Sequence, residues 1–154
     1  MRFYSFTNYY LSSIQLGIQS AHALGEMFNQ YPYGDSPVGR TLREWSANHK
    51  TMVLLNGGNS AALRDLWTLL SDPRNTKYPV SKFSEDEASL DGALTCVAIV
   101  LPEYMYDAKW IAPGTNGNDV GYWWYASDDE GHGQQIYNWE GELLTVLKRL
   151  PLAK

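Results

Sequence analysis

Hydrophobic positions over residues 1–101 form short segments of two alternating kinds. Runs rich in apolar, aromatic and β-branched residues, such as Leu94–Leu101, are typical of buried strands. Between them, apolar residues recur at helical spacing, and Ser12 or Ser13 can cap the first of these segments. The pattern predicts strands over about 3–10, 51–55, 78–83 and 94–101, and helices over about 13–30, 39–48 and 60–71.

The order of these elements predicts an α/β fold. Strands that alternate with helices form a three-layer sandwich, here a small mixed four-stranded sheet with helices on both faces. From Pro102 the pattern changes, because aromatic residues are interleaved with Gly, Asn and Asp, and a short amphipathic helix follows over about 140–150. We expect a single domain over 1–154, with a core over 1–101 and an appended aromatic hairpin or lid plus a terminal helix over 102–154.

Composition is that of an ordinary globular protein. The 154 residues are 44% hydrophobic and 19% charged, which argues against disorder. The longest apolar run, Thr95–Leu101, is too short to cross a bilayer, and the first residues lack the apolar core of a signal peptide. The single cysteine, Cys96, excludes an internal disulfide and is expected to be a buried packing residue. We expect a cytoplasmic protein without membrane contact.

Charge is distributed unevenly around the net value of −5. Residues 1–82 carry eight Lys or Arg against five Asp or Glu, whereas residues 83–154 carry four against twelve. Phosphate binding requires local positive charge, so only the first half can form a nucleic-acid face.

The predicted first helix carries a row of polar side chains. At about 100° per residue, two amides, an imidazole and a carboxylate fall within an arc of roughly 60°. A histidine can take and return a proton near neutral pH, and Gln19, one turn before His22, could orient a water. The same row also fits an ordinary amphipathic helix with no catalytic role, in which polar side chains lie along the border of the buried face. The row is Gln15, Gln19, His22 and Glu26, and the neighbouring face expected to pack on the sheet is Ile14, Ile18, Ala21 and Gly25.

Two segments resemble the type II peptidyl-tRNA hydrolases. Residues 15–23, Gln-Leu-Gly-Ile-Gln-Ser-Ala-His-Ala, resemble the family's Gly-Lys-x-x-x-Gln-x-x-His-Ala helix. Residues 92–99, Gly-Ala-Leu-Thr-Cys-Val-Ala-Ile, resemble its Gly-Thr-x-Thr-x-x-Ala-Ile strand. The order of elements between them is also similar, so the likeness covers roughly 1–101. Small divergent members of this kind occur in bacteriophage genomes, which would place the protein in the host cytoplasm.

The resemblance implies a hydrolase. The family cleaves the ester that joins a peptide, or a blocked amino acid, to the terminal ribose of tRNA, by general-base activation of water. His22 and Gln19 match the family's His and Gln, and Thr95 matches the second Thr of the strand motif and would donate to the substrate carbonyl. The resemblance implies no metal or cofactor. Arg40, Arg43 and Lys50 are the expected contacts to tRNA phosphates.

Two departures from the family pattern concern the site itself. The family's lysine falls on Gln15, at the substrate-binding end of the motif, so a positive charge is missing there. The Asp of the family's Asp-Ala-Gly turn falls on Phe83, and the nearest carboxylates are Glu85, Asp86 and Glu87, of which Asp86 is the expected replacement. The alternative is therefore a non-catalytic binding protein on the same fold, which engages a basic host protein or imitates nucleic-acid charge through its acidic, aromatic second half.

Four other motifs have a functional and a plainer explanation. His49–Thr51 matches half of a paired His-x-Thr motif but has no second copy. Asn56–Ser60 could bind an anion, yet it lacks the P-loop lysine and fits a turn with a helix cap. Asp128–His132 lacks calcium-loop spacing and fits an acidic surface turn. Tyr122–Tyr125 could stack bases, contact a protein partner or pack its own strand.

Overall fold

The computed structural model describes residues 1–32 and 34–153, without the side chain of Ser89. The chain forms two compact units. The first comprises Met1–Leu101 together with the C-terminal segment Leu150–Lys154, and the second comprises Pro102–Arg149. The boundary at Leu101 and Pro102 coincides with the change of pattern in the sequence.

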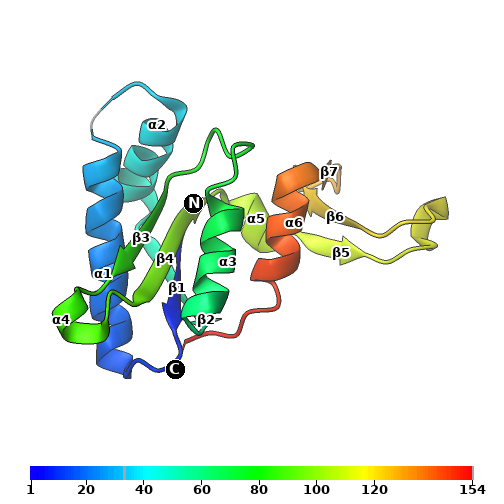
Figure 1. Cartoon of the computed structure of the whole chain (residues 1–154). Helices are drawn as coiled ribbons and strands as arrows, with labels where there is room; N and C mark the ends of the chain where they lie inside the picture. The colour runs from blue at the N-terminus through cyan, green and yellow to red at the C-terminus, as the bar shows by residue number, and fades with distance from the viewer. Residues whose placement is uncertain (33, 154) are drawn as a thin grey trace. The chain divides into compact units, whose positions relative to one another are not determined.

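The first unit is built on a four-stranded mixed sheet (Figure 1). Its strands are β1 (Arg2–Asn8), β2 (Thr51–Gly58), β3 (Val80–Ser84) and β4 (Leu94–Leu101), in the order β2-β1-β4-β3. Strand β1 is parallel to β2 and antiparallel to β4, and β3 is antiparallel to β4. The predicted mixed four-stranded sheet is thus confirmed.

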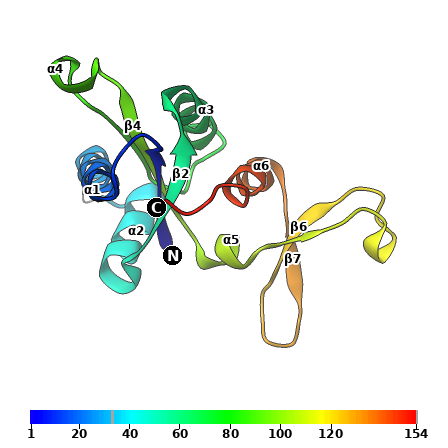
Figure 2. The same ribbon diagram turned by 90° about the horizontal axis from the view of Figure 1, so that it is seen from below.

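Helices cover both faces of this sheet. They are α1 (Ser13–Gln30), α2 (Pro37–Glu44) with its π-helical continuation η1 (Trp45–His49), α3 (Ser60–Leu70) and the short α4 (Glu87–Leu90). Figure 2 shows α1 and α2 on one side of the sheet and α3 on the other. The Ser12 hydroxyl accepts from the Gln15 amide and caps α1, as expected for a serine at this position. The first unit is therefore the predicted α/β sandwich.

The core has a layer on each side of β1. Phe3 packs with Met27, Leu42 and other buried side chains under α1 and α2. Phe6 is fully buried on the other side, where a Cβ at Gly57 would lie 3.1 Å from the Phe6 Cβ and 2.4 Å from Leu63 Cδ2. Because glycine permits this close approach, β2 continues to Gly58 and ends just before α3. The prediction of a turn from residue 56 is therefore wrong.

Cys96 is a buried packing residue, as predicted. Its side chain is fully buried, with Sγ 3.2 Å from Ser5 Oγ, and burial raises the pKa of the thiol to about 12. At pH 8 the thiolate fraction of such a group is about 10⁻⁴, and the thiolate is the reactive form.

We expect iodoacetamide to leave native Cys96 unmodified while it alkylates the urea-unfolded chain completely, as measured by intact mass. Equal rates in the two states would contradict this burial.

The second unit contains a three-stranded antiparallel sheet. Strands β5 (Lys109–Ile111), β6 (Tyr122–Ala126) and β7 (Gly133–Ile136) lie in that order. The predicted hairpin is β6–β7, to which β5 adds a strand that the sequence pattern did not indicate. The other elements are α5 (Glu103–Asp107), the 3₁₀ turn η2 (Thr115–Gly117) and α6 (Asn138–Leu147), the predicted terminal helix.

Aromatic side chains pack this second unit internally. The rings of Trp110 and Trp123 lie 5.4 Å apart edge to face, and the Trp123 indole N–H donates to Thr145 Oγ1 at 3.1 Å. Tyr104 stacks on Tyr125 at 4.5 Å. Part of the aromatic excess is therefore used in ring contacts within the second unit, although Trp110 is 51% exposed and the other three rings are only partly buried. Across the described ranges, no helix is long and apolar enough to span a membrane.

Candidate active site at the start of α1 and β4

The face that α1 buries differs from the predicted one. Ile14 is 77% exposed and Ile18 48%, and Ala21 and Gly25 are also exposed, so the prediction that these four pack on the sheet is wrong. The reason is that the sheet offers hydroxyl partners: Ser20 Oγ lies 2.6 Å from Ser5 Oγ, and Ser81 Oγ donates to the Ala23 carbonyl at 2.6 Å. The buried face is Leu16, Gln19, Ser20, Ala23 and Met27.

Gln19 is the centre of a hydrogen-bonded chain. The Thr95 hydroxyl donates to Gln19 Oε1 at 2.7 Å, and Gln19 Nε2 donates to Glu85 Oε1 at 2.5 Å. Gln19 is 4% exposed and Thr95 1%, whereas Glu85 is half-buried. We call these three residues the Gln19 cluster. Its members come from α1, from the segment after β3 and from the start of β4. The fold thus brings Gln19 together with Glu85, which is 66 positions later in the chain, and with Thr95, which is 76 positions later.

A β-bulge aims Thr95 at α1. Phe83 pairs with Cys96 and Ser84 with Leu94, which leaves Thr95 as the extra residue of β4. Strict alternation would send its side chain to the face opposite Cys96, which packs under α1. A bulge redirects the extra side chain, and here the hydroxyl reaches both Gln19 and the Phe83 carbonyl, the latter at 3.3 Å.

The carboxylate of the cluster belongs to Glu85, although Asp86 was expected there. The Glu85 backbone N–H donates to the Ala93 carbonyl at 3.1 Å and extends the pairing of β3 with β4 by one step. Asp86 is exposed and begins the turn that forms α4, since its carbonyl accepts from the N–H groups of Leu90 and Gly92. The pairing thus carries Glu85 past α1 before the chain turns away.

His22 lies one turn after Gln19 on α1 and is exposed. Its imidazole stacks on the Phe83 ring, with centroids 4.4 Å apart and planes 12° from parallel. Within residues 1–32 and 34–153, no hydrogen bond or ion pair holds the imidazole. Phe83 therefore links His22 to the Gln19 cluster, because its ring supports the imidazole and its carbonyl accepts from Thr95.

Gln15 caps the start of α1. Its Oε1 accepts from the Ser12 backbone N–H at 2.9 Å, while the Ser12 hydroxyl accepts from the Gln15 N–H at 3.4 Å. This reciprocal pair is a capping box, which satisfies two backbone donors at the helix start. The residue expected to bind substrate in place of the family's lysine thus has a local structural role.

The expected phosphate contacts lie at the other end of the sheet. Lys50 precedes Thr51, which pairs with Arg2 at the start of β1. Thr95, by contrast, precedes Cys96, which pairs with Thr7 near the end of β1. Five residues of strand separate these two positions, a distance of roughly 17 Å.

Arg40 and Arg43 lie on α2 and belong to the same end of the sheet as Lys50. Arg40 lines a cavity of about 450 Å³ with Met1 and Lys77, and its guanidinium donates to the Asp35 carbonyl. Arg43 donates to the Gly34 carbonyl at 2.8 Å and lies 3.7 Å from an Asp35 carboxylate oxygen. The charged member of the Gln19 cluster is Glu85, and no Lys or Arg occurs between Lys82 and Lys109 in the sequence.

The remaining sequence motifs have plain structural roles. His49 lies 3.1 Å from the N-terminal amine and 3.4 Å from Glu44. Asn59 caps α3 by accepting from the Ala62 N–H, which confirms the predicted helix cap. At the β6–β7 turn, His132 Nδ1 lies 2.7 Å from Asp128 Oδ2. In the part of the chain that the structure describes, no group of three or more His, Cys, Asp or Glu side chains is arranged to hold a metal ion.

The assignment of a function therefore depends on the Gln19 cluster and His22. Comparison of the sequence with known proteins gives no match, either to a family model or to a curated protein.

Proposed function

We propose that the first unit hydrolyses the ester between a peptide, or an N-blocked amino acid, and the terminal ribose of tRNA. The observation that carries the proposal is the hydrogen-bonded Gln19 cluster beside the exposed imidazole of His22. Three of the residue types that the family resemblance implies, His, Gln and Thr, meet at one place with a carboxylate. The chemistry needs a base, a group to hold water and a donor for the developing oxyanion.

His22 is the proposed general base. A ring nitrogen takes a proton from water, and the water oxygen attacks the ester carbonyl carbon to form a tetrahedral intermediate. The bond from that carbon to the ribose oxygen then breaks, and the imidazolium returns its proton to the leaving oxygen. The products are the free peptide acid and a tRNA with a free terminal hydroxyl. Stacking on Phe83 fixes the plane of the imidazole without occupying its nitrogens.

Gln19 is the proposed donor to the reacting carbonyl. One N–H of its amide is bound by Glu85 and its oxygen is bound by Thr95, so the second N–H has a fixed direction. A donor that is held in advance stabilises developing negative charge without reorganisation. Glu85 and Thr95 act here as positioning residues. In this arrangement Arg40, Arg43 and Lys50 would contact phosphates at a distance from the reacting ester.

The test is release of N-acetylphenylalanine from its tRNA ester by the full chain, compared with Gln19→Leu. Leucine fills a similar volume, and Thr95 keeps the Phe83 carbonyl as a partner, so we expect Gln19→Leu to unfold at the same urea concentration as the natural chain. We expect its kcat to fall about 100-fold or more, as when a single oxyanion donor is removed. Gln30→Leu, an exposed amide on the same helix, is the matched control and keeps full activity. No release above the protein-free rate, or full activity in Gln19→Leu, contradicts the proposal.

A second candidate function is binding without catalysis. The observation that favours it is the charge of the site: Gln15 stands where a lysine is expected, the Glu85 carboxylate accepts from Gln19, and Asp86, Glu87 and Asp91 follow within six residues of Glu85 in the sequence. The second unit adds eight Asp or Glu against three Lys or Arg. The partner would be a basic protein of the host. A stoichiometric protein partner recovered at high salt, with no ester hydrolysis, favours this candidate, whereas salt-sensitive recovery of tRNA favours the hydrolase.

A further inference from the structure

Helix α1 has a second apolar face, on the side away from the sheet. Its residues are all exposed, and three of them are large hydrophobic side chains. Figure 2 shows no described element of the first unit beyond α1 on this side. We call this face the α1 stripe, and its residues are Ile14, Ile18, Ala21, Gly25 and Phe28.

The residues of the α1 stripe are four, three, four and three positions apart. This is the spacing of the a and d positions in the heptad repeat, with which one helix packs against another. At about 100° per residue the five lie within an arc of roughly 80°, opposite the buried face of α1. A helix that is apolar on both sides is normally buried on both sides. The stripe therefore has the form of a surface for a second helix.

Gly25 leaves space on the stripe for the close approach of another helix. Glycine inside a helix is destabilising relative to alanine, because it loses more backbone freedom on folding. Nothing in the described part of the chain requires glycine here, since a Cβ at Gly25 would have no neighbour within 4 Å outside its own helix backbone. A helix packed on the outside of α1 would use this space. Ala21, one turn earlier, makes the gap longer.

The stripe is complementary to a second copy of itself when the two helices run antiparallel. A two-fold axis near Ala21 places Ile14 opposite Phe28 of the second copy, because each lies seven residues from Ala21, about 10.5 Å along the helix. Ile18 then falls beside Gly25 of the second copy, within about 1.5 Å of its level along the axis. In each half of the interface a large side chain thus enters a gap between small ones, as a knob enters a hole.

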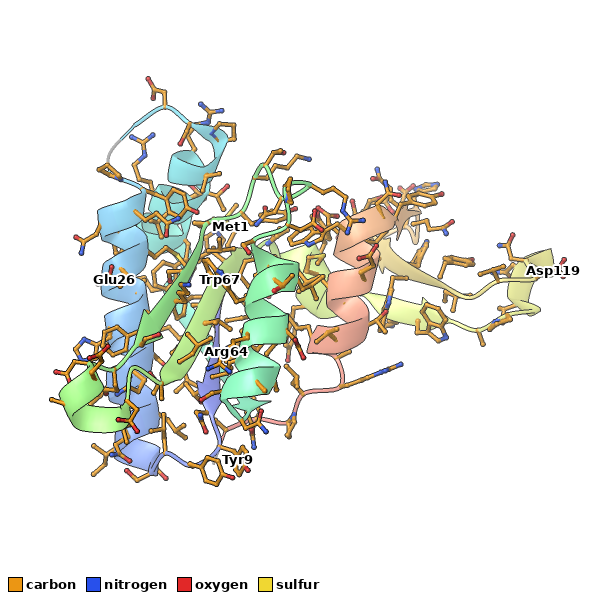
Figure 3. All side chains as sticks on the ribbon, in the orientation of Figure 1. Met1, Tyr9, Glu26, Arg64, Trp67 and Asp119 are labelled. Atoms are coloured by element: carbon orange, nitrogen blue, oxygen red, sulfur yellow. The ribbon has the colours of Figure 1, made fainter. Side chains whose placement is uncertain are left out.

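The charge of α1 favours the antiparallel direction. Glu26 is the only Asp, Glu, Lys or Arg in α1, and Figure 3 shows it in the C-terminal part of the helix, away from Tyr9. An antiparallel pair separates the two Glu26 residues by about 15 Å along the axis, whereas a parallel pair places them at one level, where they repel. A helix that lies on a membrane surface carries Lys or Arg on its polar face, and α1 has neither.

We propose that the α1 stripe is the interface of a symmetric homodimer, in which two α1 helices pack antiparallel about a two-fold axis near Ala21. The inference goes beyond the proposed hydrolase function and does not depend on it. Gln15 and His22 lie on one flank of α1, about 80–100° from the centre of the stripe, and are not used in the contact. One helix from each copy makes a small interface, so we expect a dissociation constant in the micromolar range.

The experiment is sedimentation of the full chain from micromolar to millimolar concentration. We expect the average mass to rise from that of one chain towards that of two. Ile18→Glu places two carboxylates in the contact and should weaken the dimer about 100-fold or more. Val120→Glu changes an exposed apolar residue of the second unit in the same way, and should dimerise like the natural chain.

Gly25→Leu separates a contact between copies from a role within one copy. Leucine is the better helix former and has room in the isolated unit, so the urea midpoint measured at low concentration should not fall. The same side chain fills the gap that Ile18 of the second copy needs, so the dimer should weaken about tenfold or more.

Cross-linking with a short bismaleimide tests the direction of the helices. Ala21→Cys should be cross-linked to its copy and Glu26→Cys should not, while the buried Cys96 does not react in the folded chain. The inference is overturned if the natural chain stays monomeric at millimolar concentration, or if folded Ile18→Glu or Gly25→Leu dimerises like the natural chain. It is also overturned if Val120→Glu loses the dimer equally, or if Glu26→Cys is cross-linked as readily as Ala21→Cys.

Discussion

Replacement of His22 by Ala is expected to lower kcat for hydrolysis of N-acetylphenylalanyl-tRNA by roughly 10²- to 10⁴-fold, the usual contribution of a general base. The imidazole is exposed and is held by stacking on Phe83, so its removal deletes the base and leaves the Gln19 cluster bonded. The measurement is single-turnover release of N-acetylphenylalanine with the full chain in excess over its substrate. Substrate affinity should change little, because the ring contributes to the chemical step.

The matched control for this variant is His132→Ala. His132 is another exposed histidine, in the β6–β7 turn beside Asp128, and has no part in the proposed mechanism. Its replacement should leave the rate at the value of the natural chain. A His22→Ala chain that remains folded and hydrolyses the ester at the natural rate would exclude His22 as the base, whatever the activity of the other variants.

The elements that depend on local pattern could be predicted from the sequence. Leu94–Leu101 is apolar except for Thr95 and is β4 with the same bounds, and the serine before the first helical segment is its cap. The buried face of α1 could not be predicted in this way. Hydropathy favours burial of Ile14 and Ile18, but the strand residues beneath α1 include serines, and these pair with Ser20 and the backbone instead.

Three residues of the candidate site were predicted from the sequence, but their geometry was not. His22, Gln19 and Thr95 came from the resemblance of two segments to one family. The choice between Glu85 and Asp86 depends on the bulge at Thr95 and on how far β3 stays paired with β4, and neither is visible in the residue types.

Replacement of Phe6 by Ala is expected to lower the free energy of unfolding of the first unit by about 3–5 kcal/mol. Phe6 is fully buried on β1, the strand between β2 and β4, and its backbone and Cβ pack against Gly57. The substitution leaves a cavity that the paired strands cannot close, so both the lost burial and the cavity are destabilising. The measurement is urea dependence of hydrogen exchange at the β4 amides, which reports on the first unit.

The matched control for this variant is Phe28→Ala, the same substitution at a side chain on α1 that is 39% exposed. It should cost less than about 1.5 kcal/mol, because the ring is already partly exposed to solvent and its removal leaves no closed cavity. Since Phe6 faces α3 and not the Gln19 cluster, Phe6→Ala should hydrolyse the ester normally at a temperature where the unit remains folded. Equal losses of stability in the two variants would mean that the layer between β1 and α3 is not closely packed, and that the extension of β2 through Gly57 has another cause.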